Sequence, residues 1–349
     1  GPAAAQTLDQ PVRVRLHWQT ISWNGSGAAP SKLGIYVALG GSSAPRLFEF
    51  DTGGAGFYPT FATAGSPWWG SDVTPTGYTF DQKYDAGQNK YKGDVVSTSL
   101  SFFDHESASQ PRLTLADVVV GQSLTLNDKP IDPDPSMPPL EKAFWGDFGM
   151  APKQGKAGKD PSGALPGDPP IIDSLLAQLT YGAKVTPGFR VHASSERPWV
   201  QFGLGQDDLN LAAPALTYTL NATSQLSGSK VPYYQDYVVT GSLTINGATS
   251  YCDGQLGMIL DTGAFTTIYD TSQRIPDSLV SGGQVAPGAS LAISGDPIAS
   301  GSPCLAVPSP FMALTAGPTV NQDLVWVSDL GGKGDYLNTG MLPFLSNDI

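Results

Sequence analysis

The tripeptide Asp-Thr-Gly occurs twice in this chain, each time where an apolar run ends. Residues 47–50 lead into Asp51-Thr52-Gly53, and residues 258–260 lead into Asp261-Thr262-Gly263. The two acids lie 210 positions apart, one in each half of the 349-residue chain. Two such copies predict two acids brought face to face, which is the arrangement needed to share a proton and activate a water molecule.

Composition favours a chain of many short strands. Glycine (41 residues) and proline (30 residues) are abundant, whereas charged residues make up only 14% of the chain, and long amphipathic helices are scarce. This mixture is typical of strands joined by turns, so we predict an all-β fold. The length allows two domains. The second half of the strand pattern begins near Asp207, so we expect domains at residues 1–206 and 207–349.

The charge balance excludes some partners. The chain has 19 basic and 31 acidic residues, for a net charge of −12. No basic stripe is present that would neutralise phosphates, so we expect neither nucleic acid nor an anionic membrane surface as a partner. No apolar run approaches the length of a transmembrane segment.

Two further segments carry local signals. Residues 83–103 alternate around a polar tip and predict a β-hairpin, with Tyr84 just before the tip. Residues 171–179 place five apolar side chains on one helical face, after Pro169-Pro170, and predict the best helix of the chain. Asn246-Gly247 between alternating runs predicts a second hairpin turn.

The chemistry of a paired acid explains each position of the tripeptide. Two carboxylates about 3 Å apart do not both ionise, so one holds a proton while the other accepts one from water. This is general acid–base catalysis without a covalent intermediate. The threonine hydroxyl can tie its loop to the opposite loop, and the glycine permits a tight turn and a close backbone approach.

On these residues the chain resembles the pepsin-like aspartic proteases, over nearly its whole length. The two tripeptides resemble the catalytic loops, residues 145–150 with the helix that follows resemble the family's hydrophobic-hydrophobic-glycine segment, and residues 200–203 resemble the strand that enters the second lobe. The resemblance implies a bilobal all-β fold with a cleft between the lobes, peptide or protein substrates, and no cofactor. It also implies a hairpin flap whose tyrosine is Tyr84, with Tyr91 as the rival.

The sequence departs from that family at several positions. Gly54 and Ala264 stand where the family usually has Ser or Thr after the glycine. Tyr58, with Phe57, stands where the family has an indole that hydrogen-bonds the flap tyrosine, and Tyr58 still offers a hydroxyl. Polar residues interrupt two apolar segments, at Asp147 and at Asn338-Thr339.

Only two cysteines are present, Cys252 and Cys304. In an exported protein such a pair predicts a disulfide, which would close a loop of about fifty residues and stabilise the fold by roughly 4 kcal/mol; two buried thiols are the alternative. We therefore expect a secreted, periplasmic or cell-surface protein. The three histidines lack metal-ligand spacing, so no metal site is expected.

These observations predict an aspartic endopeptidase in which Asp51 and Asp261 are catalytic. Because one chain carries both catalytic loops, we expect a monomer. The missing hydroxyls at residues 54 and 264 leave an alternative, a catalytically inactive pepsin-fold binding or inhibitor protein. A third possibility is an adhesive or carbohydrate-binding β protein in which the tripeptides are ordinary turns.

Overall fold

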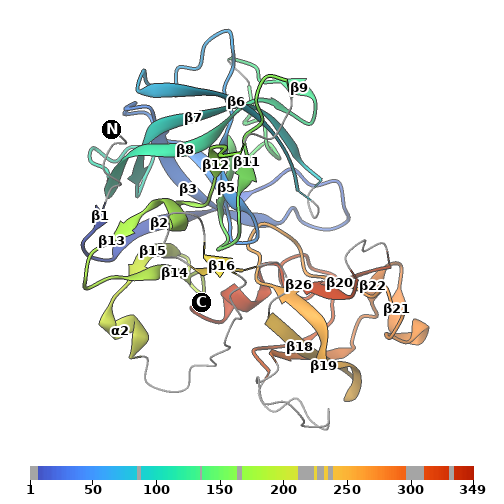
Figure 1. Ribbon diagram of the computed structural model, residues 1–349. Helices are drawn as coiled ribbons and strands as arrows, with labels where there is room; N and C mark the ends of the chain where they lie inside the picture. The colour runs from blue at the N-terminus through green and yellow to red at the C-terminus, as the bar shows by residue number, and fades with distance from the viewer. Residues whose placement is uncertain are drawn as a thin grey trace.

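The chain forms two large β-sheets, one in each half (Figure 1). The computed structural model describes residues 7–84, 88–133, 136–162, 167–210, 224–225, 232–234, 239–295, 310–329 and 334–349. Most regular structure in these ranges is strand. The predictions of an all-β fold and of two lobes are confirmed, whereas the boundary between residues 206 and 207 stays a prediction.

The sheet of the first lobe has eleven strands. They are β2 (Val12–Thr20), β3 (Ser31–Leu39), β4 (Arg46–Asp51), β5 (Ala55–Pro59), β6 (Val73–Lys83), β7 (Lys90–Phe103), β8 (Leu113–Leu126), β9 (Lys129–Pro130), β10 (Gly146–Met150), β14 (Thr186–His192) and β15 (Trp199–Leu204). The main path is β14-β15-β2-β3-β4-β10-β5. Strand β7 also pairs with β3 and carries β6 and β8 on its two edges, and β9 pairs with β8.

The sheet of the second lobe has nine strands. They are β18 (Val239–Ile245), β19 (Ala248–Ile259), β20 (Thr267–Tyr269), β21 (Val280–Ser281), β22 (Gln284–Val285), β23 (Ser290–Gly295), β24 (Met312–Thr315), β25 (Trp326–Ser328) and β26 (Tyr336–Asn338). Their order is β21-β22-β25-β20-β26-β19-β18-β23-β24. Asn246 and Gly247 join β18 to β19 with φ angles of 51° and 76°, which confirms the predicted hairpin turn.

The same three-strand unit occurs in both lobes. In the first lobe, β10 pairs parallel with β4 and antiparallel with β5. In the second lobe, β26 pairs parallel with β19 and antiparallel with β20. The strand that leads to each Asp-Thr-Gly therefore lies beside a later parallel strand from its own lobe.

Each lobe has its own hydrophobic core. The core of the first lobe contains Phe48, Phe50 and Phe148, and the core of the second contains Leu243, Ile268 and Leu337, all of them almost fully buried. Strand β4 is buried over five consecutive residues because it lies between β3 and β10. Its apolar residues Leu47, Phe48 and Phe50 consequently fall on both faces of the strand, with Glu49 and Asp51 buried among them.

The remaining elements are short. They are β1 (Thr7–Leu8), β11 (Lys156–Ala157), β12 (Ile171–Ile172), β13 (Thr180–Tyr181), β16 (Ser224–Gln225), β17 (Pro232–Tyr233), α1 (Leu175–Gln178), α2 (Gln206–Leu209) and the 3₁₀ helices η1 (Asp277–Leu279) and η2 (Leu342–Leu345).

The predicted helix at residues 171–179 is wrong in its extent. Ile171 and Ile172 form β12, which pairs antiparallel with β11, and only the single turn α1 is helical. Both residues are β-branched, which favours an extended backbone. The apolar spacing instead reflects one buried strand residue and one buried helical turn placed in succession.

The predicted hairpin at residues 83–103 is present as part of a longer one. Strand β6 pairs with β7 from Val73 to Lys83, and Tyr84 donates its backbone N–H to the carbonyl of Asn89. The tip at residues 85–87 lies outside the described residues. Tyr84 therefore stands at the end of the hairpin, as predicted.

Candidate active site

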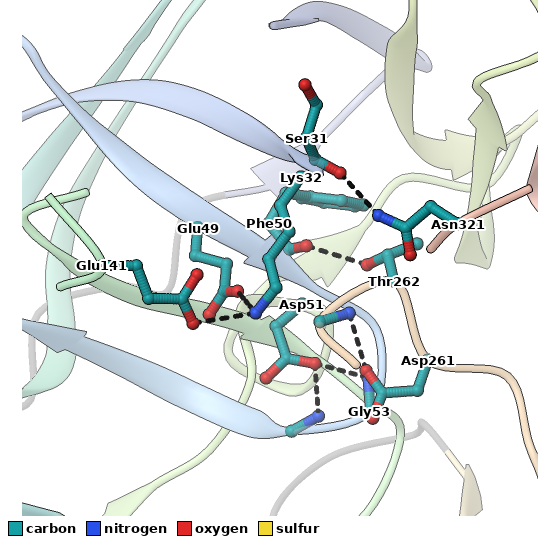
Figure 2. Close-up of polar contacts among 12 residues, drawn as sticks. Ser31, Lys32, Glu49, Phe50, Asp51, Gly53, Glu141, Asp261, Thr262 and Asn321 are labelled. Carbon is teal, nitrogen blue, oxygen red and sulfur yellow. Dashed lines mark hydrogen bonds and ion pairs between the residues drawn. The ribbon is translucent and has the colours of Figure 1, made fainter. Parts of the chain in front are cut away.

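Two loops, one from each lobe, meet at the Asp-Thr-Gly tripeptides. Strand β4 ends at Asp51, and β19 ends two residues before Asp261. Figure 2 shows Asp51 and Asp261 approaching each other from the two loops. The fold thus brings together two acids that lie 210 positions apart in the sequence.

Thr52 and Thr262 join the loops through a symmetric set of four hydrogen bonds. The Thr52 hydroxyl donates to the carbonyl of Leu260 (2.8 Å) and accepts the backbone N–H of Thr262 (3.0 Å). The Thr262 hydroxyl donates to the carbonyl of Phe50 (2.8 Å) and accepts the backbone N–H of Thr52 (3.1 Å). Each hydroxyl uses its donor and an acceptor position, so a hydroxyl residue is needed at both places.

Gly53 and Gly263 leave room for the acid of the opposite loop. A Cβ atom on Gly53 would lie 2.2 Å from Asp261 Cγ, and a Cβ atom on Gly263 would lie 2.8 Å from Asp51 Cγ. Both distances are shorter than any van der Waals contact between carbon atoms. Each carboxyl therefore packs directly on the backbone of the other loop.

A Cβ atom on Gly263 would lie 2.8 Å from Asp51 Oδ1 and 3.2 Å from Asp261 Oδ1, so the carboxyls of Asp51 and Asp261 lie beside each other. Each residue is only 7% exposed. Asp51 Oδ1 accepts the backbone N–H groups of Gly53 (2.8 Å) and Gly54 (3.1 Å). Two buried carboxyls this close do not both ionise readily, so the pair is suited to hold one shared proton.

Asp261 is the acid of this pair whose proton affinity is raised. Burial and the neighbouring Asp51 raise the pKa of Asp261 to about 7, against hydrogen bonds from Asn338 and Gly263 that lower it. The Asn338 amide donates to Asp261 Oδ2 at 2.9 Å, and its carbonyl accepts the backbone N–H of Gly340 at 3.0 Å. Sequence reasoning noted Asn338 only as an interruption of an apolar segment and missed this contact.

Tyr84 occupies the space of the missing side chain at Gly54. A Cβ atom on Gly54 would lie 2.7 Å from a ring carbon of Tyr84 and 2.8 Å from Asp51 Oδ2. The Tyr84 hydroxyl is buried and has no hydrogen-bond partner among the described residues. Because residue 54 is glycine, the Tyr84 ring has room to pack beside Asp51. The flap role of Tyr84 stays a prediction.

Three tyrosine rings pack together behind this position. The ring centroid of Tyr58 lies 6.1 Å from that of Tyr84 and 5.8 Å from that of Tyr91, and those of Tyr84 and Tyr91 are 5.9 Å apart. The Tyr58 hydroxyl has no hydrogen-bond partner within the described structure. Tyr58 therefore contacts Tyr84 through the edge of its ring. Tyr91, the rival flap residue, is only 1% exposed.

Sequence reasoning missed a buried charged group next to Asp51. Lys32 Nζ lies 2.7 Å from Glu49 Oε1 and 2.9 Å from Glu141 Oε1, as Figure 2 shows. Asp147 stands opposite Glu49 in the pairing of β10 with β4, on the same face of the sheet as Asp51. The available signal was the presence of charged residues inside otherwise apolar strands.

The sequence also led to expectations about a disulfide, a metal site and a membrane-spanning segment. Cys252 lies in β19, but Cys304 is outside the described residues, so their disulfide stays a prediction. In the part of the chain that the structure describes, no cluster of three or more His, Cys, Asp or Glu side chains is placed to hold a metal ion. In the same part, none of the helices has the length and apolar character needed to cross a membrane.

A serine, a histidine and an aspartate also come together at the surface. His192 Nδ1 lies 2.6 Å from Asp348 Oδ1, and His192 Nε2 lies 3.1 Å from Ser195 Oγ. Asp348 also pairs with Arg190 at 2.6 Å, and Ile349 forms two backbone hydrogen bonds with Val191. These contacts fasten the last residues to β14, so we assign the group a structural role.

Comparison with solved structures agrees with this architecture. The chain is similar to an aspartic proteinase from Irpex lacteus, with 14% sequence identity and a TM-score of 0.54, over 97% of this chain and 93% of that chain. The chain has the bilobal pepsin-like fold. No protein-family model and no curated protein sequence matches it. At this identity the likeness to a pepsin-like proteinase establishes the fold alone.

Proposed function

We propose that this protein is an aspartic endopeptidase that hydrolyses extended peptides between Asp51 and Asp261. The observation that supports this most strongly is the close placement of two buried carboxyls inside a reciprocal threonine network. A pair of acids that must share one proton is suited to give a proton to one atom and take a proton from another.

In the proposed reaction, a water molecule between the acids attacks the peptide carbonyl. Asp51 takes a proton from the water as the water oxygen bonds to the carbonyl carbon. Asp261 gives its proton to the carbonyl oxygen. The tetrahedral intermediate then collapses. The proton on Asp51 passes to the leaving nitrogen as the C–N bond breaks, and a hydroxyl proton returns to Asp261, so that one water is added and both acids are restored.

The raised pKa of Asp261 sets the direction of the pH dependence. Asp261 must hold its proton to act as the acid, and burial beside Asp51 raises its pKa to about 7. The rate is therefore expected to fall as the pH rises through about 7, because the acid has then lost its proton. The titration belongs to the pair rather than to either residue.

The inactive alternative has a specific observation in its favour. Neither Gly54 nor Ala264 offers a hydroxyl to the adjacent acid, whereas the family resemblance leads us to expect one at each place. A binding or inhibitor protein with the same fold would keep the architecture without turnover.

Export from the cell, a monomeric state and the Cys252–Cys304 disulfide remain part of the proposal.

One experiment separates these readings. A denatured protein substrate is incubated with the wild type at several values between about pH 3 and 8, with and without pepstatin. Asp51→Asn and Asp261→Asn are assayed beside it, with the exposed Asp72→Asn and Asp277→Asn as matched controls, one in each lobe. We expect the two site variants to lose about 10³-fold or more in rate and the controls to retain it. Equal cleavage by all five proteins would refute the proposal, and cleavage by none would favour the binding protein.

A further inference from the structure

Asp147 lies beside the paired acids, on a strand next to the one that ends at Asp51. In the parallel pairing of β10 with β4, Asp147 stands opposite Glu49 and Gly149 stands opposite Asp51. Side chains two residues apart on a strand share a face. Asp147 and Glu49 therefore lie on the face of the sheet that carries Asp51. A Cβ atom on Gly149 would lie 2.4 Å from the carbonyl oxygen of Gly54, so the backbone after the first tripeptide packs there.

Asp147 is a buried carboxyl. The residue is 3% exposed, and it stands beside Glu49 on the face that carries Asp51. As a carboxylate, its Oδ2 atom would face no hydrogen-bond donor among the described residues. A buried oxygen that faces other carboxyl oxygens is stable only when a proton lies between them.

The nearby cation is already neutralised. Lys32 Nζ contacts both Glu49 and Glu141, at 2.7 and 2.9 Å, and its side chain is 8% exposed. Burial alone would lower the pKa of Lys32, yet the two glutamates hold it above its ordinary value. One ammonium shared by two carboxylates leaves no positive charge to balance a third.

The other groups that face Asp147 offer no positive charge. They are Glu49 and Asp51 on β4, Tyr58 on β5, Tyr84 at the end of β6 and Tyr91 on β7. Burial, followed by Asp51 and Glu49, raises the pKa of Asp147 well above its ordinary value. The three phenols are neutral as well, because burial and Asp147 raise their pKa values.

We propose that Asp147 is a third carboxyl of the site, a neutral hydrogen-bond donor that positions Asp51 from behind, held in place by Glu49 and Lys32. This inference rests on the proposed endopeptidase function. Asp147 does not touch the reacting atoms. It acts through Asp51, whose charged form its O–H stabilises, so the site stays active at lower pH than the pair alone would allow.

The first test is the pH–rate profile of two substitutions. Asp147→Asn keeps an N–H donor that cannot titrate, whereas Asp147→Leu removes the donor and keeps a similar volume. We expect the acid limb of the profile to move upward by about one pH unit in the leucine variant and to stay near the wild-type position in the asparagine variant. An acid limb that stays at the wild-type pH in both variants, or that moves by the same amount in both, would overturn the inference.

The second test does not depend on proteolysis. Infrared spectra are recorded at about pH 8 in an Asp261→Asn background, which removes the other protonated acid of the site. We expect a protonated-carboxyl band that disappears when Asp147→Asn is added and persists when the exposed control Asp72→Asn is added. An unchanged spectrum with Asp147→Asn would refute the neutral acid. A lost band, together with a wild type that cleaves no substrate, would retain the buried proton and reject the endopeptidase.

Discussion

Replacing Asp261 by asparagine is expected to stabilise the folded protein at neutral pH and to leave its stability nearly unchanged at acid pH. The reason is the proton that the buried pair holds. Below about pH 4, Asp261 is protonated in both the folded and the unfolded chain. As the pH rises further, the unfolded chain loses this proton while the folded chain keeps it, so folding becomes less favourable.

The magnitude follows from the pKa of Asp261. Burial and the neighbouring Asp51 raise this pKa from 3.8 to about 7. At about 1.4 kcal/mol per pH unit, the wild type loses about 4 kcal/mol of unfolding free energy between acid and neutral pH through this group. Asparagine has a similar shape and no proton to lose, so the variant avoids this loss.

Urea-induced unfolding at about pH 4 and about pH 7 measures the difference directly. We expect Asp261→Asn to match the wild type at the lower pH and to be more stable by several kcal/mol at the higher one. Asp277→Asn, at an exposed position of the same lobe, serves as the control, and a gel of each sample checks that the unfolded wild-type chain is not cleaved. A stability difference that is the same at both pH values would refute the shared proton.

Three further substitutions test the geometry around the pair. Gly53→Ala places a Cβ atom 2.2 Å from Asp261 Cγ, so we expect loss of cleavage and a lower melting temperature, and an active alanine variant would contradict the close packing of the acid. Thr52→Val removes the hydroxyl bonds to both Leu260 and Thr262 and is expected to cost about 1–3 kcal/mol in urea unfolding, whereas Thr52→Ser should recover most of it. Asn338→Leu removes a hydrogen bond that lowers the pKa of Asp261, so the alkaline limb of the pH–rate profile should move upward by about one pH unit; a downward move would show that the sign is wrong.

The meeting of Asp51 and Asp261 could be predicted because its signal is local. Each acid follows an apolar run and precedes a threonine and a glycine, and the required chemistry explains each residue type. The hairpin that ends at Tyr84 could be predicted for the same reason, since alternation and a polar tip are visible within a short segment. The packing of the Tyr84 ring against Gly54 could not, because it depends on contacts between separate strands.

The group around Asp147 could not be predicted from the sequence alone. Its members come from β3, β4 and β10, and their contact depends on strand order and register, which one sequence does not determine. The sequence did show that charged residues interrupt apolar strands at Lys32, Glu49 and Asp147. Such residues in buried strands indicate a paired internal group, although they do not say which residues pair.

The failure at residues 171–179 has a different cause. The spacing of the apolar residues predicts a single helix, but a two-residue strand followed by one helical turn produces the same spacing. The pairing of β12 with β11 decides the conformation of the first half, and this pairing is a tertiary contact.

A carbon-13 NMR titration of the aspartate carboxyls tests the shared proton most directly. The resonance that disappears in Asp261→Asn identifies Asp261, and its midpoint gives the proton affinity of that acid in the folded protein. The structure predicts a midpoint at about pH 7, set by burial and the contact with Asp51. A midpoint near 3.8, the ordinary value for an aspartate, would show that the two carboxyls ionise independently and would contradict the account.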